Sequence, residues 1–193
     1  MRKVIYSMGV SLDGFIADRD GQLDWSRPDE ELMRFHIEQT REIGAQACGR
    51  GLYWDMLYWE APEQARWGPL EREFARMWTA IPKVVFSTTL TSVPGNARLA
   101  EGDVADEIAK LKAEPGERVV SVGGAGFAAS LVELDLIDEY RLFVSPVLLG
   151  GGTAFFPPLP KRIALEPIET RTFGSRVVYS RYRRISSGPG MLR

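Results

Sequence analysis

Residues 118–131 read RVVSVGGAGFAASL, an apolar run that enters a cluster of glycines and continues with apolar residues at helical spacing. This order of residue types predicts a strand, a tight turn and a helix. Glycine lets the backbone approach a bulky group closely, and the first amides of a helix lack partners, so such a turn is a natural receptor for phosphate or pyrophosphate. A packing turn of an ordinary α/β protein is the alternative interpretation.

Residues 124–129 also match the Gly-x-Gly-x-x-Ala form of the dinucleotide fingerprint, which would indicate a Rossmann dehydrogenase. In a Rossmann domain this turn follows the first strand, and several βα units come after it. Here only residues 127–193 follow Gly126, and they show little helical pattern. The position therefore favours a nucleotide-binding turn near the end of a different α/β sheet.

Composition limits the class of protein. The chain has 193 residues, a net charge of −2 and an apolar fraction of 45%. We expect a single domain over residues 1–185 and a disordered tail over residues 186–193. A charge so close to zero gives no general attraction for nucleic acid or for an anionic membrane.

Cysteine and apolar content indicate the compartment. Cys48 is the only cysteine, which excludes an internal disulfide and a Cys-rich zinc site, and no metal site is predicted. No stretch approaches the roughly 20 apolar residues that a membrane helix needs. We therefore expect a cytoplasmic protein.

The pattern along the chain predicts an α/β fold with a mixed sheet of about eight strands. A β-branched first strand is expected in the sheet centre, and the last two strands are expected to form an antiparallel hairpin. The expected strands cover residues 3–10, 45–48, 82–86, 97–99, 118–122, 139–146, 162–170 and 176–183. Helical spacing is found mainly from residue 28 to 43, 52 to 57, 62 to 80, 104 to 112 and 127 to 138.

Candidate ligand-binding residues follow several of these strands. Asp13 beside Gly14 is either a substrate contact or the start of an Asx turn. Arg50 after Gly49 would lie at a helix N-terminus, as a phosphate ligand or as a solvated arginine. The hydroxyls of Ser87 and Thr88 are expected at the carboxyl edge of the sheet, where open α/β sheets bind ligands.

Two further features complete the set. Glycines 150–152, followed by Thr153, form either a loop that wraps a ligand or a plain mobile loop. His36 is the only histidine, and its position within a helix indicates a surface or half-buried residue rather than a catalyst.

These motifs together resemble the dihydrofolate-reductase-like superfamily, and specifically the riboflavin-biosynthesis reductase family, the RibD C-terminal domain of bacterial deaminase-reductases. The resemblance rests on SLDGFIA at 11–17, GR at 49–50, VVFSTTL at 84–90, VGGA at 122–125 and EYRLFVSPVLLGGGT at 139–153. We expect no deaminase half in this sequence, because its zinc-binding pattern of H-x-E with C-x-x-C is not found here.

The resemblance implies a three-layer fold that binds NADPH across the carboxyl edge of its sheet, with helices on both faces. Gly49 and Arg50 would then hold cofactor phosphate, and Ser87 and Thr88 would lie near the adenosine 2′-phosphate. The turn 123–126 (Gly123, Gly124, Ala125 and Gly126) would take the pyrophosphate. Ala17 would meet the nicotinamide, Thr153 would also contact the cofactor, and Asp13 would face the substrate.

One departure from the family pattern is visible. Family members often read Gly-Arg-x-Thr-Tyr-Glu, whereas this chain has Leu52 and Trp54 at the Thr and Glu positions. Leu52 has no hydroxyl, so its side chain cannot make one phosphate contact of the family.

The functional hypothesis is hydride transfer from NADPH to a small polar heterocycle by a homodimer, with the proton supplied by Asp13 or water. Asp24 and Glu139 are secondary candidates for the proton donor. Two alternatives stay open: an NADP(H)-binding dimeric sensor or scaffold without turnover, and a Rossmann dehydrogenase that prefers NAD.

Overall fold

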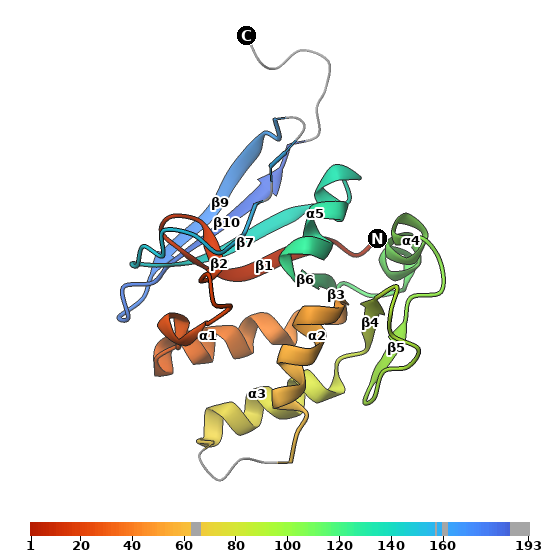
Figure 1. The fold of residues 1–193 in the computed structure, drawn as a ribbon, viewed down its shortest axis with the longest axis horizontal. Helices are drawn as coiled ribbons and strands as arrows, with labels where there is room; N and C mark the ends of the chain where they lie inside the picture. Colours follow the sequence, from red (N-terminus) through yellow and green to blue (C-terminus); the bar gives the residue numbers. More distant parts are fainter. Residues whose placement is uncertain (63–66, 157, 160–161, 186–193) are drawn as a thin grey trace.

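The computed structural model describes residues 1–62, 67–156, 158–159 and 162–185, and Figure 1 shows how they fold. Eight strands form one sheet in the order β5-β4-β3-β6-β1-β7-β10-β9. They are β1 (Val4–Ser11), β3 (Ile43–Gly49), β4 (Lys83–Phe86), β5 (Ala97–Leu99), β6 (Val119–Gly123), β7 (Glu139–Ser145), β9 (Leu165–Thr172) and β10 (Val178–Arg184). A separate two-stranded sheet joins β2 (Phe15–Ala17) to β8 (Thr153–Ala154).

The strands from β5 to β7 run parallel to one another, and β10 is antiparallel to both β7 and β9. This arrangement confirms the predicted mixed sheet, the central first strand and the C-terminal antiparallel hairpin. It also removes the Rossmann alternative, because the glycine turn follows β6 and not the first strand, and the last two strands are antiparallel.

Five α-helices and two 3₁₀ turns connect the strands in the described residues. They are α1 (Glu30–Arg41), α2 (Arg50–Met56), α3 (Pro69–Ala80), α4 (Val104–Ala113) and α5 (Ala125–Glu133), with η1 (Asp24–Ser26) and η2 (Leu57–Trp59). Two predicted helices are shorter than expected. The helix expected over 62–80 begins at Pro69, whose fixed φ suits the first helical position, and the helix expected to reach 138 ends at Glu133.

The helices cover both faces of the sheet (Figure 1). On one face, Ile108 of α4 and Leu131 of α5 pack against a core that includes Tyr6 and Val122. On the other face, Phe35 of α1 packs against strand residues of a second core. In β7, Tyr140 belongs to the first core and Phe143 to the second, so the sheet lies between two layers of helices.

The register of the parallel strands sets the position of their last residues. Gly49 pairs with Phe86, Cys48 pairs with Gly123, and Ser11 pairs with Ser145. The loops after β1, β3, β4, β6 and β7 therefore leave the sheet along the same carboxyl edge.

The described part of the chain contains no helix that is long and apolar enough to cross a membrane. The predicted tail at 186–193 lies outside the described residues.

Candidate functional site

The glycine turn lies at the end of a central strand. Gly123 is the last residue of β6, and Gly124, with a φ of 88°, directly precedes α5. No side chain caps this helix start, so the amides of its first turn are available to a ligand at the carboxyl edge. A Cβ placed on Gly126 would meet nothing within 4 Å, which shows that the turn is open on its outer side.

Arg50 begins the neighbouring helix. It follows Gly49, and its guanidinium donates a hydrogen bond to Thr89 Oγ1 at 2.8 Å. The hydroxyl loop after β4 is itself ordered, because Ser87 Oγ accepts hydrogen bonds from the backbone N–H groups of Thr89 and Leu90. A fixed positive charge and a hydroxyl loop therefore lie side by side, and Thr88 is exposed in that loop.

Close packing joins these segments. A Cβ on Gly49 would lie 3.3 Å from Phe127 Cβ, and a Cβ on Gly124 would lie 3.8 Å from the Gly49 backbone nitrogen. Phe127 also stacks on Phe86, with 4.3 Å between ring centroids. The structure thus brings together the predicted residues Gly49, Arg50, Ser87 and Thr88 and those of the turn 123–126.

Asp13 joins the loops after β1 and β7. Its carboxylate accepts hydrogen bonds from the Ser11 hydroxyl at 2.6 Å, from the Gly150 amide at 2.7 Å and from the Leu149 amide at 3.1 Å. The Ser11 hydroxyl first, and then the two amides, lower the pKa of Asp13 to about 2, against an opposing effect of desolvation. The carboxylate is ionised at neutral pH and holds the glycine loop, which argues against Asp13 as the proton donor.

Ala17 and Thr153 face each other in the small sheet of β2 and β8. A Cβ on Gly152 would lie 2.0 Å from the Ala17 carbonyl oxygen, so only glycine permits this close approach of the two strands. Arg19 adds a second clamp, because its guanidinium donates to the Gly150 carbonyl at 2.7 Å. These residues lie beyond the same carboxyl edge, next to the loops after β1 and β7.

Two titratable residues have structural roles. His36 is half-buried on α1, as predicted, with its ring centroid 4.4 Å from that of Phe143, and burial lowers its pKa to about 4. Cys48 is buried, and burial raises the pKa of its thiol to about 12, so the thiol is unreactive at neutral pH. The described residues contain no group of His, Cys, Asp and Glu that could hold a metal ion.

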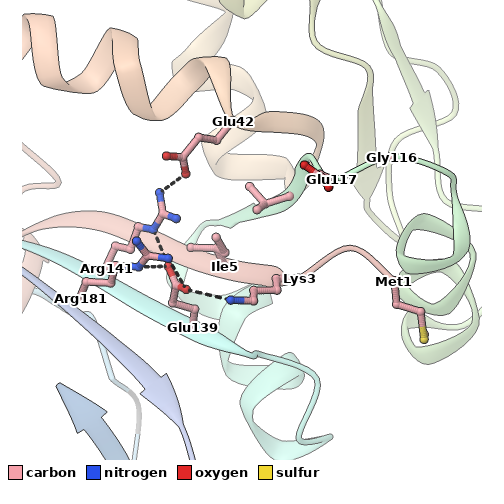
Figure 2. Close-up of a pocket in the computed structure, with 10 residues that line it drawn as sticks. Met1, Lys3, Ile5, Glu42, Gly116, Glu117, Glu139, Arg141 and Arg181 are labelled. Carbon is pink, nitrogen blue, oxygen red and sulfur yellow. Dashed lines mark hydrogen bonds and ion pairs between the residues drawn. The ribbon is translucent and has the colours of Figure 1, made fainter. Parts of the chain in front are cut away.

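A hollow of about 480 Å³ lies at the opposite edge of the sheet (Figure 2). Lys3, Val119 and Glu139 line it from the amino ends of three parallel strands.

Glu139 forms ion pairs with Arg141 and Arg181 at 2.8 and 2.7 Å, and these bonds lower its pKa although burial alone would raise it. The secondary proposal of Glu139 as proton donor is therefore wrong, because this ionised carboxylate lies at the edge away from Asp13. Asp24, the other secondary candidate, is exposed in η1.

The sequence model of the RibD C-terminal domain matches residues 2–179. The chain belongs to this family. A curated relative, the uncharacterized protein YyaP of Bacillus subtilis (strain 168), is 33% identical over 177 residues and is matched over 92% of each chain.

Solved structures agree on the fold. A Shewanella sp. PV-4 protein named for riboflavin biosynthesis has a TM-score of 0.74 at 25% identity, covering 96% of this chain and all of its own. A Thermotoga maritima diaminohydroxyphosphoribosylaminopyrimidine deaminase/5-amino-6-(5-phosphoribosylamino)uracil reductase scores 0.63 at 18% identity, over 95% of this chain and 57% of that one. Enterococcus faecalis dihydrofolate reductase, solved with NADP(H), has a TM-score of 0.65 at 17% identity, covering 95% of this chain and 97% of its own. This RibD C-terminal domain therefore has the dihydrofolate-reductase-like, reductase-type fold.

The residues at the carboxyl edge fit a dinucleotide. Phosphates require hydrogen-bond donors and positive charge. These come from the open main-chain amides at Gly126, the uncapped start of α5 and the Arg50 guanidinium. Sequence reasoning did not select Thr89, Arg19 and Phe127 for the site. Thr89 could have been found from its place beside Ser87 and Thr88, whereas nothing local to Arg19 or Phe127 indicates their contacts.

Proposed function

We propose that this RibD C-terminal domain is an NADPH-dependent reductase that transfers a hydride to a small polar heterocyclic substrate. The observation that carries the proposal is the contact between three separate segments at one sheet edge: the Gly49–Arg50 start of α2, the hydroxyl loop after β4 and the turn 123–126. Each supplies donors or positive charge suited to phosphate, and together they suit a molecule with several phosphates.

The cofactor-binding roles follow from position. Arg50, Ser87 and Thr88 would bind the 2′-phosphate end of NADPH, and the amides of the turn 123–126 would bind its pyrophosphate. Ala17 and Thr153, at the other end of the same edge, would line the nicotinamide side. When bound, NADPH supplies the hydride, and this chain supplies orientation and charge.

Asp13 is proposed as a positioning residue at the substrate side. Because its carboxylate is ionised and already accepts several hydrogen bonds, its role is to fix the glycine loop that borders the substrate. The proton that accompanies hydride transfer would then come from water. The comparison proteins that carry out reductase chemistry act on heterocycles, as the names of the Thermotoga maritima and Enterococcus faecalis proteins state, and we propose this substrate class here.

A second candidate is an NADP(H)-binding protein without turnover. It is favoured by the ionised state of Asp13, which leaves the substrate side without an evident carboxylic acid donor. Both candidates predict binding, and only the reductase predicts cofactor oxidation.

The test has two steps. NADPH at about a hundred times its dissociation constant should add roughly 2.7 kcal/mol to the free energy of unfolding, measured by thermal or urea denaturation. The oxidation of NADPH is then followed as a decrease in absorbance at ~340 nm. The substrates offered are pterins and pyrimidines that carry ribityl or ribosyl groups. Stabilisation with oxidation supports the reductase, stabilisation without oxidation supports the binding protein, and no stabilisation contradicts both.

We also propose that the protein is a homodimer. Strand β9 forms one edge of the sheet, and nearly all of its residues are exposed, so a second copy could cover it. Sedimentation equilibrium should give about twice the chain mass, and a monomer mass at micromolar concentration would contradict the proposal.

A further inference from the structure

Leu52 packs on the glycine turn. A Cβ placed on Gly123 would lie only 2.0 Å from Leu52 Cδ2, and a Cβ on Gly124 would lie 3.5 Å from Leu52 Cβ. Gly123 is buried, and Leu52 is half-buried over it. A side chain at Gly123 would therefore displace the end of the Leu52 side chain, whether or not a ligand approaches there.

Leu52 is also one of two adjacent anchors of α2. Tyr53, which is 1% exposed, packs in the core with Cys48 and Val85, and its hydroxyl donates to the Pro94 carbonyl at 2.7 Å. Tyr53 thus holds the helix toward β4 and the loop that follows it, and Leu52 holds it toward β6 and α5. Strand β3 ends at Gly49 and so holds the backbone before Arg50, and these two side chains hold the short helix α2 (Arg50–Met56) that continues from it.

We propose that Leu52 is a positioning residue that fixes the Arg50 guanidinium relative to the amides of the turn 123–126. The inference rests on the proposed function, in which Arg50 and this turn bind phosphates of the same molecule. A binding site loses affinity when its groups are displaced by about 1 Å, so the residue that sets their separation controls affinity without touching the ligand. The sequence departure at Leu52 then replaces a hydroxyl with a packing contact between the two phosphate-binding segments.

The experiment is a double-mutant cycle on NADPH binding with the full chain. We expect Leu52→Ala to raise the Kd for NADPH by about tenfold, the scale of a partly lost charge-assisted hydrogen bond. If Leu52 acts through Arg50, the variant Arg50→Ala/Leu52→Ala binds NADPH as weakly as Arg50→Ala alone. Additive losses in the double variant, or an unchanged Kd in Leu52→Ala, would overturn the proposal.

Two controls separate positioning from general loss of stability. Leu57→Ala shortens another leucine that packs on the same Cys48 cluster but belongs to η2, beyond the end of α2, so it should lower stability and leave the Kd unchanged. Leu52→Met keeps a long apolar side chain over Gly123 and should bind NADPH within about twofold of the parent. If Leu57→Ala weakens binding as much as Leu52→Ala does, positioning is excluded.

Should Leu52→Ala fail to fold, Leu52→Val and Leu57→Val form a milder pair with the same expected contrast. Failure of the parent chain to bind NADPH would contradict the proposed function itself. Binding by the parent with additive losses would contradict only the inference about Leu52.

Discussion

The carboxylate of Asp13 accepts a hydrogen bond from the backbone N–H of Gly150 at 2.7 Å, which joins two loops far apart in the sequence. Arg19 holds the same glycine from its carbonyl side at 2.7 Å. Glycines 150–152 all have positive φ, a conformation that side chains other than hydrogen rarely permit. Asp13 and Arg19 therefore hold this glycine loop from its two sides, in addition to the pairing of β2 with β8.

The first prediction concerns this loop. Asp13→Ala removes the acceptor for the Leu149 and Gly150 amides, so hydrogen exchange at both amides should accelerate several-fold under native conditions. Asp20→Ala is the matched control, since Asp20 is exposed and is not among the groups that bond this loop. Unchanged exchange in Asp13→Ala would show that the loop is held by other contacts.

The ionised state of Asp13 gives a second prediction, on pH. A pKa lowered to about 2 keeps the carboxylate charged across the working range, and protonation removes its contribution to loop order only as pH falls from about 4 through 2. For any substrate that the enzyme reduces, the pH profile of kcat should show no ionisation of Asp13 between pH 5 and 9. If the profile does show an ionisation in this range, and Asp13→Asn abolishes it, Asp13 is the proton donor.

Arg50 supplies the third prediction. Arg50→Ala should weaken NADPH binding by about 1.5 to 3 kcal/mol, the scale of a hydrogen bond to a charged group, as measured by isothermal titration calorimetry. Arg34→Ala removes an exposed arginine of α1 that pairs with Glu30 and should leave the affinity unchanged. Equal NADPH affinities for the parent and Arg50→Ala would show that Arg50 is a solvated residue that does not bind the cofactor.

The packing of Leu52 on Gly123 gives the fourth prediction, on stability. Gly123→Ala inserts a methyl group 2.0 Å from Leu52 Cδ2, and overpacking of this kind should lower the free energy of unfolding by about 1 to 3 kcal/mol. Leu52→Ala provides room for the new methyl group, so the double variant should be more stable than the sum of the two single losses indicates. Strict additivity in urea denaturation would show that the two residues are not in contact.

His36 gives the fifth prediction. Burial against Phe143 lowers its pKa from 6.5 to about 4, so the folded state favours the neutral ring. The stability contributed by the neutral ring is present in full above pH 6.5 and is lost as pH falls through about 4, by about 3 kcal/mol in total. His36→Phe should remove this part of the pH dependence of urea denaturation, and parallel curves for the two proteins would contradict the neutral state of the half-buried His36 ring.

Much of the fold was predictable because its signals are local. The apolar run before Gly123, the β-branched first strand and the hairpin at the end each follow from short patterns of residue types. The same signals located Gly49, Arg50 and Ser87 at strand ends, and parallel strands place such ends on one edge. The boundaries of α3 were missed, although Pro69 is a recognised first helical residue.

Contacts between distant segments could not be predicted in this way. The bonds from Asp13 to Leu149 and Gly150 depend on the pairing of β1 with β7, and the packing of Leu52 on Gly123 depends on how α2 docks. Glu139 is a different case. Its position at the amino end of a parallel strand already placed it away from the ligand edge.

The most direct test of the proposed cofactor site is hydrogen–deuterium exchange with and without NADPH. Protection confined to peptides that cover residues 15–17, 49–52, 87–90, 123–127 and 150–153 is the result predicted here. Protection at the hollow near Lys3 and Glu139, or no protection at all, would contradict a dinucleotide site at the carboxyl edge.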